Sequence, residues 1–187
     1  MIVFLSLGSN IGNRLDNFKK VYSIIEEQGK NSIISKSRVY ETSPMENLNQ
    51  NQFLNQVIKI KTELNPLGLL NLIKRIEIKM GRINTEKRYM PRIIDIDILA
   101  YDSINIDTDK LSIPHPKIKS RKFILKPWTD IAPDYILSNG KSTIKELFEN
   151  ISHFKDEVKK YNQLCHHYIL IYLLKELLVQ EKQVLQI

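Results

Sequence analysis

A short apolar run that contains two carboxylates sets the main constraint on the fold of this chain. Residues 93–99 read I-I-D-I-D-I-L, and their β-branched and apolar side chains predict a buried strand. Successive side chains of a strand point to opposite faces, so Asp95 and Asp97 project side by side from the same face. The fold must therefore contain a sheet that presents two adjacent carboxylates on one face.

These carboxylates predict either a cation site or a solvated sheet edge. Burial of two like charges side by side opposes the ionisation of both unless a cation lies between them. Mg²⁺ would be such a cation, because it takes oxygen ligands and completes its coordination with water and substrate phosphates. In the alternative, Asp95 and Asp97 lie in water or pair with lysines. The basic segment 82–92, R-I-N-T-E-K-R-Y-M-P-R, directly precedes the strand and favours the metal site.

Composition restricts the class of protein. The chain has 187 residues, 42% of them hydrophobic, which is enough for one well-packed domain. Its formal charge of +7 favours an anionic partner, whether nucleotide phosphate, nucleic acid or membrane surface. One cysteine, Cys165, and no secretory leader in residues 1–7 lead us to expect a cytoplasmic protein without disulfides. No apolar run approaches the roughly 20 residues that span a bilayer, so we expect no membrane span.

Hydrophobic periodicity predicts an α+β fold. The expected order is strand, helix, strand, strand, helix, strand, over residues 1–7, 15–25, 33–40, 53–64, 66–80 and 93–99. Asn65 with Pro66 predicts the start of the second helix and Gly81 its end, and Thr143 with Glu146 forms a capping-box pattern for a later helix. This order is the split β-α-β pattern of ferredoxin-like folds, with an antiparallel sheet and helices mostly on one face.

Glycine and proline residues delimit two further segments. The turn at 8–13, G-S-N-I-G-N, lacks both G-x-G-x-x-G and the lysine of a Walker sequence, so we read it as a plain strand-to-helix connection. The segment 120–126 is expected to end before Pro127, because proline disrupts regular backbone pairing.

Further candidate residues each have a structural alternative. Phe53 and Asn55 share a face of their strand, where a ring and an amide either bind a flat heterocycle or belong to the core. His115 lies between two prolines and either donates to phosphate or has no role. Glu77 either contacts a metal or ribose or pairs with a helix neighbour, and residue type favours pairing with Arg75 or Lys79.

Several motifs, in order along the chain, resemble one family. They are L-G-S-N-I-G-N-R at 7–14, E-T-S-P-M at 41–45, F-L-N-Q-V at 53–57, R-Y-M-P-R-I-I-D-I-D-I-L at 88–99, I-P-H-P at 113–116 and S-R-K-F-I-L-K-P at 120–127. From Met1 to about Tyr135 the sequence resembles hydroxymethyl-dihydropterin pyrophosphokinase of folate synthesis. The resemblance implies transfer of pyrophosphate from ATP to 6-hydroxymethyl-7,8-dihydropterin, with release of AMP, by a ferredoxin-like protein.

The resemblance also implies roles for individual residues. Two Mg²⁺ ions would bind to Asp95 and Asp97, and these carboxylates with Arg82 and Arg92 would be the catalytic residues. ATP would be contacted by Glu77, Arg82, Arg92, Ile98, His115 and Arg121. The pterin would stack between Phe53 and Phe123, with Thr42, Met45 and Asn55 at its polar edge. Such transfer depends mainly on positioning and charge neutralisation, which metals and arginines supply.

The sequence departs from the family pattern at three positions and at its end. Met90 stands where a small residue is usual, Tyr89 where tryptophan is common and Pro116 where an aromatic is common, which bears on how a loop closes. We expect residues 1–159 to form the pyrophosphokinase domain and residues 160–187 a C-terminal helical extension. The extension contains Y-I-L-I-Y-L-L-K-E-L-L-V, apolar nearly all round, so we expect it to self-associate or to contact a partner domain.

Two other classes of function remain open on the residues alone. A basic ferredoxin-like domain with aromatic side chains on its sheet can be an RNA-binding module. The aromatic run of that module is missing, and paired carboxylates do not suit a surface that attracts phosphate without a metal, so we expect small-molecule substrates and no nucleic acid. A two-metal nuclease or nucleotidyl transferase would use D-x-D equally well, and the pocket around Phe53, Asn55 and Phe123 distinguishes it from the family above.

Overall fold

A computed structural model of the chain describes residues 1–27, 29–44, 50–82, 90–152 and 157–162. In these residues a six-stranded sheet contains β1 (Ile2–Ser9), β2 (Asn31–Lys36), β3 (Tyr40–Thr42), β4 (Phe53–Thr62), β5 (Asp95–Tyr101) and β8 (Val158–Lys160). The strands β6 (Ile106–Asp107) and β7 (Ser112–Ile113) form a separate hairpin. The helices are α1 (Arg14–Glu26), α2 (Pro66–Lys79), α3 (Lys122–Thr129) and α4 (Ile144–Ile151), with a 3₁₀ turn at Ile118–Ser120.

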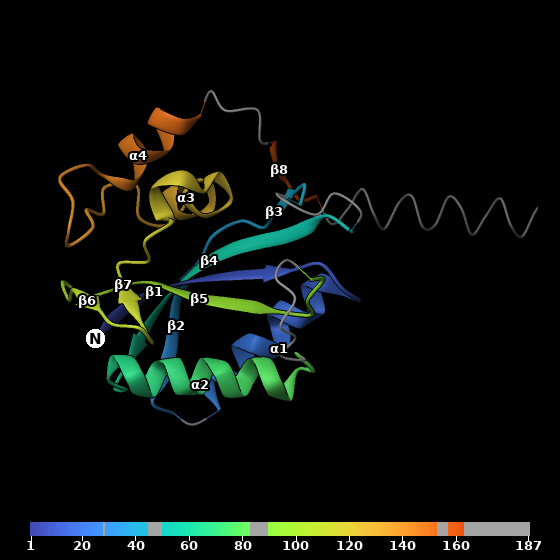
Figure 1. Ribbon diagram of the computed structural model, residues 1–187. Helices are drawn as coiled ribbons and strands as arrows, with labels where there is room; N and C mark the ends of the chain where they lie inside the picture. The colour runs from blue at the N-terminus through green and yellow to red at the C-terminus, as the bar shows by residue number, and fades with distance from the viewer. Residues whose placement is uncertain (28, 45–49, 83–89, 153–156, 163–187) are drawn as a thin grey trace, which may run out of the picture.

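The strand order confirms the predicted ferredoxin-like fold. The sheet runs β5-β1-β4-β3-β8, β2 also pairs with β4, and all of these pairings are antiparallel (Figure 1). The register places Gly8 of β1 opposite both Asn55 and Asp95, and Ser6 opposite Asp97. The central strand β1 therefore brings the start of β4 close to the start of β5.

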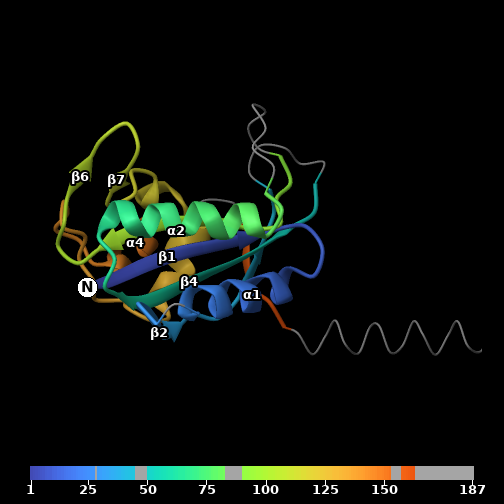
Figure 2. The same cartoon turned by 90° about the horizontal axis from the view of Figure 1, so that it is seen from below.

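Helices cover both faces of the sheet. α1 and α2 lie over one face (Figure 2), where Leu5, Ile58 and Ile98 belong to a shared hydrophobic core. α3 and α4 lie over the opposite face (Figure 1), with a second core around Phe4 and Trp128. The expectation of helices mostly on one face is therefore incomplete, because the pattern of the first hundred residues does not reveal this second layer.

The predicted helix ends are confirmed. The Oδ1 of Asn65 accepts a hydrogen bond from Gly68 N–H at 2.8 Å, with Pro66 at the first helical position. Gly81, just beyond α2, has a φ of 92°, a conformation that favours glycine. Thr143 and Glu146 form both hydrogen bonds of a capping box at the start of α4.

The prediction of one continuous strand at residues 33–40 is wrong, because the chain leaves the sheet between β2 and β3. Ser37 lies at this break. Its backbone N–H donates to the carbonyl of Val57 at 2.9 Å, and the N–H of Val57 donates to the Oγ of Ser37 at 3.1 Å. A side-chain oxygen thus replaces a backbone acceptor, which the alternation of apolar and polar residues does not reveal.

The expectation that the segment 120–126 ends before Pro127 is also wrong, because α3 continues through this proline. A proline inside a helix removes one backbone hydrogen bond and costs about 3 kcal/mol. Ile124 and Leu125 are completely buried in the second core. Each such side chain contributes about 1.5–3 kcal/mol when it leaves water, so tertiary packing offsets the cost.

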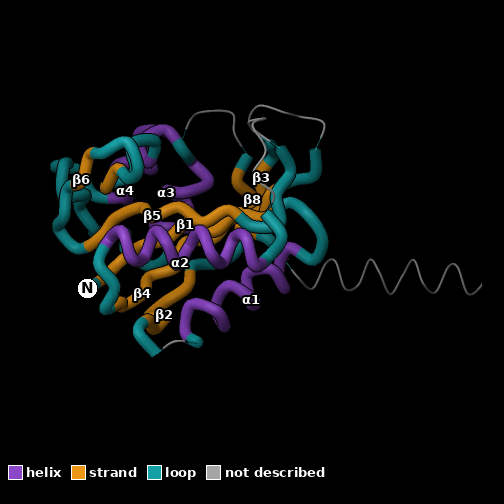
Figure 3. The backbone as a smooth tube through the Cα atoms, turned by 60° about the horizontal axis from the view of Figure 1, so that its bottom comes forward, coloured by secondary structure: helices purple, strands orange, loops and turns teal. Residues whose placement is uncertain are grey.

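The sheet extends to the end of the described chain. β8 pairs with β3 at one end of the sheet (Figure 3), and the N–H of Tyr161 donates to the carbonyl of Val39 at 2.9 Å. The expected domain boundary between residues 159 and 160 thus falls inside β8. The residues 163–187, which contain most of the predicted extension, lie outside the described ranges. In the described ranges, no helix has the length and apolar character needed to cross a membrane.

Candidate active site

A cavity of about 470 Å³ opens where β1, β4 and β5 meet beside α3. This volume lies in the range of roughly 300–1,000 Å³ that is usual for small-molecule sites. The cavity brings together many of the predicted site residues, namely Phe53, Asn55, Arg92, Asp95, Asp97, Arg121 and Phe123. It is also lined by Ser6, Gly8, Ser43, Gln50, Lys117 and Ser120.

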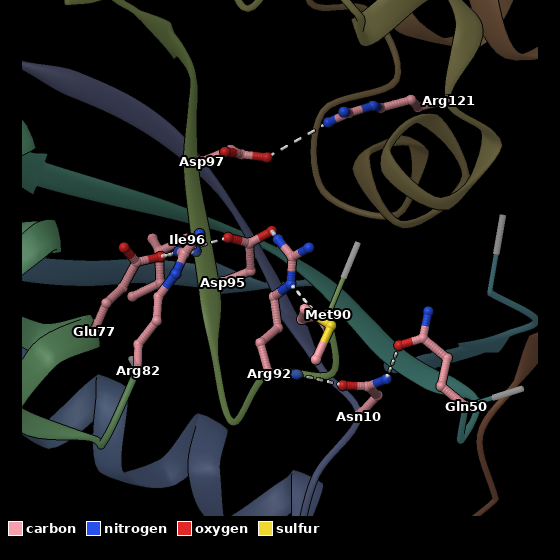
Figure 4. A network of polar contacts seen from close by, with 10 residues as sticks. All are labelled: Asn10, Gln50, Glu77, Arg82, Met90, Arg92, Asp95, Ile96, Asp97 and Arg121. Atoms are coloured by element: carbon pink, nitrogen blue, oxygen red, sulfur yellow. Dashed lines mark hydrogen bonds and ion pairs between the residues drawn. The ribbon is translucent and has the colours of Figure 1, made fainter. Parts of the chain in front are cut away.

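Asp95 lies between two arginines of the basic segment. Its Oδ1 accepts from Nη1 of Arg82 at 2.7 Å, and its Oδ2 accepts from Nη1 of Arg92 at 2.6 Å (Figure 4). Hydrogen bonds between charged groups at this distance are about twice as strong as those between neutral groups. Both guanidinium groups therefore converge on one carboxylate at the start of β5.

Asp97 lies two residues further along β5 and lines the same cavity. Nη1 of Arg121 lies 3.5 Å from its Oδ2 (Figure 4). Burial raises the pKa of Asp97 to about 6, and the charge of Asp95 adds to this rise. A further cation close to both carboxylates would favour the ionised form of Asp97.

Glu77 contacts groups other than those expected from its helix. The predicted pairing with Arg75 or Lys79 is wrong, because the carboxylate of Glu77 accepts from Arg82 and from Ile96 N–H, the latter at 3.0 Å (Figure 4). β5 is an edge strand, so its free N–H groups need partners outside the sheet. Burial raises the pKa of Glu77 to about 7, although the charge of Arg82 opposes this rise.

Of the described residues predicted to bind the pterin, Phe53, Asn55 and Phe123 line the cavity and Thr42 does not. Phe53 and Phe123 both line it, and the guanidinium of Arg121 lies 5.5 Å from the ring centre of Phe123. Asn55 is buried, and its Nδ2 donates to the Oγ1 of Thr42 at 2.8 Å. This hydrogen bond fixes the orientation of the Asn55 amide in the cavity wall. The remaining candidate, Met45, lies outside the described residues.

Four of the predicted nucleotide residues do not line the cavity, namely Glu77 and Arg82, described above, and Ile98 and His115. The side chain of Ile98 belongs to the core beneath the sheet, so only its main chain can contact a nucleotide. His115 is half-buried, and its Nδ1 accepts from the N–H of Lys117 at 3.1 Å, which leaves the proton on Nε2. Burial lowers the pKa of His115 to about 4, and the charges of Arg121 and Lys117 add to this effect. His115 is therefore a neutral Nε2–H donor.

The three departures from the family pattern lie near the basic segment or near His115. Met90 is exposed, and its carbonyl accepts from Nε of Arg92 at 3.4 Å. Pro116 directly follows His115, and Tyr89 lies outside the described residues. The backbone of residue 90 thus contacts the guanidinium that also binds Asp95.

Sequence reasoning missed the polar residues that hold the end of the basic segment. The turn at 8–13 does connect β1 to α1, but Asn10 also accepts from Arg92 N–H at 2.8 Å. Asn17 donates to the carbonyl of Ile93 at 3.1 Å. Buried amides normally have partners, but the sequence does not show which distant backbone supplies them.

Comparison with known proteins identifies relatives of this chain. The family model for 7,8-dihydro-6-hydroxymethylpterin-pyrophosphokinase (HPPK) matches residues 4–133. A folate synthesis bifunctional protein of Arabidopsis thaliana is 42% identical over 139 residues, which are 74% of this chain and 28% of that protein. A 2-amino-4-hydroxy-6-hydroxymethyldihydropteridine pyrophosphokinase of Bacillus subtilis is 39% identical over 130 residues, which are 70% of this chain and 77% of that protein.

Solved structures share the fold. A crystal structure of an HPPK-DHPS in complex with substrates superposes with a TM-score of 0.66 and 17% identity, over 80% of this chain and 43% of that chain. This chain thus spans 28% of the A. thaliana protein and 43% of the HPPK-DHPS chain, but 77% of the B. subtilis enzyme. The chain belongs to the 7,8-dihydro-6-hydroxymethylpterin-pyrophosphokinase (HPPK) family.

Proposed function

We propose that this chain transfers pyrophosphate from ATP to the hydroxymethyl group of 6-hydroxymethyl-7,8-dihydropterin, which yields AMP and the pterin diphosphate for folate biosynthesis. One observation carries the proposal: a single cavity is lined both by two aromatic rings and an amide and by two carboxylates that contact arginines. Membership of the HPPK family supports the same reaction. The cavity thus offers both a surface for a flat heterocycle and a charged surface for a triphosphate.

Arginine and histidine side chains would bind the triphosphate of ATP. Arg82, Arg92 and Arg121 all lie within hydrogen-bonding reach of the two β5 carboxylates. Their planar guanidinium groups remain charged and can bind two phosphate oxygens at once. His115 would add a neutral Nε2–H donor. These residues would orient the middle phosphorus toward the pterin hydroxyl, whose oxygen forms the new bond as AMP leaves.

We further propose that the reaction depends on magnesium and that Asp95 and Asp97 hold two Mg²⁺ ions. Hard carboxylate oxygens suit this cation, and burial has raised the pKa of Asp97, which a cation would lower again. In the described ranges, no cluster of three or more His, Cys, Asp or Glu could hold a metal. The remaining ligands would therefore be phosphate oxygens and water. When bound, Mg²⁺ neutralises charge that develops on the phosphates.

The pterin would stack between Phe53 and Phe123. Asn55 would present its oriented amide to the polar edge of the heterocycle, and Thr42 would keep that amide in place. Met45 remains a candidate from the sequence alone. This arrangement would hold the hydroxymethyl group toward Asp95 and Asp97, because Phe53, Asn55 and Phe123 line the same cavity as these carboxylates.

Replacing Phe53 by alanine should weaken pterin binding by about 1–3 kcal/mol, or roughly 5- to 150-fold, through lost stacking and burial. Asn55→Ala should have a similar effect, because the polar edge of the heterocycle would lose its partner. The affinity for an ATP analogue should change little in either variant. Isothermal titration calorimetry with each ligand separately measures both affinities.

A matched control for Phe53→Ala is Phe148→Ala, which removes an aromatic ring that packs against the second core and does not line the cavity. This control should bind pterin as the wild type does. Equal losses of pterin and nucleotide affinity in Phe53→Ala would mean that Phe53 is only a core residue.

Thermal unfolding with added ligands tests the proposed function against nucleic-acid binding. A ligand that binds only the folded state stabilises it, by about 2.7 kcal/mol at a hundredfold excess over its Kd. We expect the melting temperature to rise with an ATP analogue, Mg²⁺ and a pterin together. A rise with a single-stranded oligonucleotide and none with these small molecules would contradict the proposal.

The C-terminal segment is the proposed contact with a second chain or a partner domain. Its apolar run at 168–179 would be favoured to leave water by about 25 cal/mol per Å². Relatives such as the A. thaliana protein are bifunctional by name, which supports a partner domain. The single cysteine supports a cytoplasmic location as part of the same proposal.

Removal of residues 163–187 should change the oligomeric state in solution, the solubility or the melting temperature, because the apolar run would lose its contact. Truncation after Asn162 keeps β8 and the hydrogen bond from Tyr161 to Val39. Analytical ultracentrifugation and thermal unfolding of both chains measure the effect. If the two chains match in all three properties, the segment has no such contact.

A further inference from the structure

Asn10 contacts two loops, one that ends at Arg92 and one that contains Gln50 and Asn51. It is 1% exposed, and its Oδ1 accepts from the backbone N–H of Arg92 at 2.8 Å. Its Nδ2 donates to Oε1 of Gln50 at 3.0 Å (Figure 4). The same Nδ2 also donates to the carbonyl of Asn51 at 3.3 Å. The backbone N–H of Asn10 also donates to the carbonyl of Arg92 at 3.2 Å. One buried carboxamide thus uses both of its ends, each toward a different loop.

The first loop carries a proposed phosphate ligand. Ser9 Oγ donates to the carbonyl of Ile93 at 2.6 Å, and Asn17 donates to the same carbonyl at 3.1 Å. Together with Asn10, these residues hold the backbone from Arg92 to Ile93 against the start of α1. The guanidinium of Arg92 extends from this backbone to Asp95. Asn10 therefore helps to set the position from which Arg92 reaches the phosphates.

The second loop leads into the proposed pterin wall. Gln50 lines the cavity itself, and Asn51 lies two residues before Phe53 at the start of β4. The side chain of Asn10 hydrogen-bonds to this loop, and so does Arg14 at the start of α1, which donates to the carbonyl of Gln52 at 2.8 Å. A shift of the loop around the heterocycle would therefore move the group that holds Arg92.

We infer that Asn10 is a positioning residue that couples the pterin subsite to the nucleotide subsite through its two-sided amide. This inference rests on the proposed function and deepens it. A pterin that fixes the Gln50 loop also fixes Asn10 and, through it, Arg92, so each substrate binds better when the other is present. Such coupling is reciprocal and typically amounts to about 5- to 150-fold in affinity.

A purely structural role for Asn10 predicts a different result, and Asn31 provides the matched control. Asn31 is 5% exposed, donates to the carbonyl of Ile25 at 3.1 Å and accepts from Oγ1 of Thr62 at 2.6 Å. It lies at the opposite end of β4 from Phe53, because it pairs with Thr62. Asn31→Ala removes a buried amide of the same kind without contact with either subsite.

The test measures pterin affinity by calorimetry with and without α,β-methylene-ATP and Mg²⁺, using 6-hydroxymethylpterin as the second ligand. The ratio of the two affinities is the coupling factor. In Asn10→Ala this factor should fall at least about fivefold relative to the wild type. Gln50→Ala removes the hydrogen bond between Asn10 and Gln50 from its other side, at a residue that is not fully buried. Any direct effect of this change on pterin affinity is the same with and without the nucleotide, so it cancels in the coupling factor. The double variant should lose no more coupling than either single variant.

The outcomes separate this inference from the proposed function. Retained coupling in both single variants, or an equal loss in Asn31→Ala, overturns the role of Asn10 while pterin-dependent AMP formation by the wild type still supports the reaction. Absence of that AMP formation in the wild type overturns the proposed function and the inference with it. Loss of coupling in Asn10→Ala and Gln50→Ala, with Asn31→Ala unchanged, supports the inference.

Discussion

Asp97→Ala is expected to lower turnover by several orders of magnitude while the chain remains folded. The carboxylate is one of two proposed metal ligands on β5, and without it the two proposed Mg²⁺ ions keep only Asp95 as a protein ligand. Asp97 lines the cavity and contacts Arg121 at 3.5 Å, so its removal leaves the two hydrophobic cores intact. Steady-state measurement of AMP formation gives the turnover, and circular dichroism reports the fold.

The raised pKa of Asp97 predicts that the stability of the folded state depends on pH. The pKa of Asp97 is raised from 3.8 to about 6, so the folded state prefers the protonated carboxyl group. The stability that this preference contributes is present below pH 3.8 and is lost as the pH rises through about 6. Asp97→Asn keeps the shape without the charge and avoids that loss.

Near pH 8 we therefore expect Asp97→Asn to be more stable than the wild type by about 1 kcal/mol, or roughly 2–4 °C in Tm, allowing for the partly exposed side chain. The difference should disappear toward pH 4. Thermal unfolding of both proteins at the two pH values measures it in the absence of Mg²⁺. A variant that is less stable at pH 8, or that retains wild-type turnover, would contradict the proposed site.

Arg92→Ala is expected to lower kcat by about 10³-fold or more, an effect typical of arginines that stabilise a transferring phosphoryl group. The affinity for an ATP analogue should fall much less, because the proposed contact is strongest when charge develops in the transition state. Arg92 reaches the cavity from the basic segment and contacts Asp95 at 2.6 Å. Single-turnover kinetics together with calorimetric titration separate the two effects.

Two variants serve as controls for Arg92→Ala. Arg92→Lys keeps the charge but not the planar pair of donors, so its kcat should lie between those of the wild type and the alanine variant. Arg75→Ala removes one positive charge from the exposed face of α2, and its kcat should match the wild type. Equal losses of kcat and nucleotide affinity in Arg92→Ala would limit this residue to ground-state binding.

The main elements of the fold follow from local sequence patterns. The apolar strand around Asp95, the helix that starts at Asn65 and the capping box at Thr143 are each encoded within a few residues. The break at Ser37 and the passage of α3 through Pro127 depend on partners far away in the chain. Local periodicity contains no information about such partners, because packing and side-chain hydrogen bonds decide these cases.

Local sequence patterns likewise predict only part of the candidate site. The faces of β4 and β5 are fixed by alternation, so the shared cavity of Phe53, Asn55 and Asp97 follows from the sequence and the strand order. The partner of Glu77 does not, because residue type alone favours Arg75 and Lys79, which lie two positions away and do not face Glu77 on the helix, whereas the edge of β5 supplies Ile96. The contacts of Asn10 likewise require three separate segments to meet.

The nucleotide product tests the central claim most directly. The full chain is incubated with 6-hydroxymethyl-7,8-dihydropterin, ATP and Mg²⁺, and the nucleotides are separated by chromatography. We expect AMP to form together with the pterin diphosphate, to require the pterin, and to disappear in Asp97→Ala. Formation of ADP, or release of AMP equally well without the pterin, would contradict transfer of pyrophosphate by this chain.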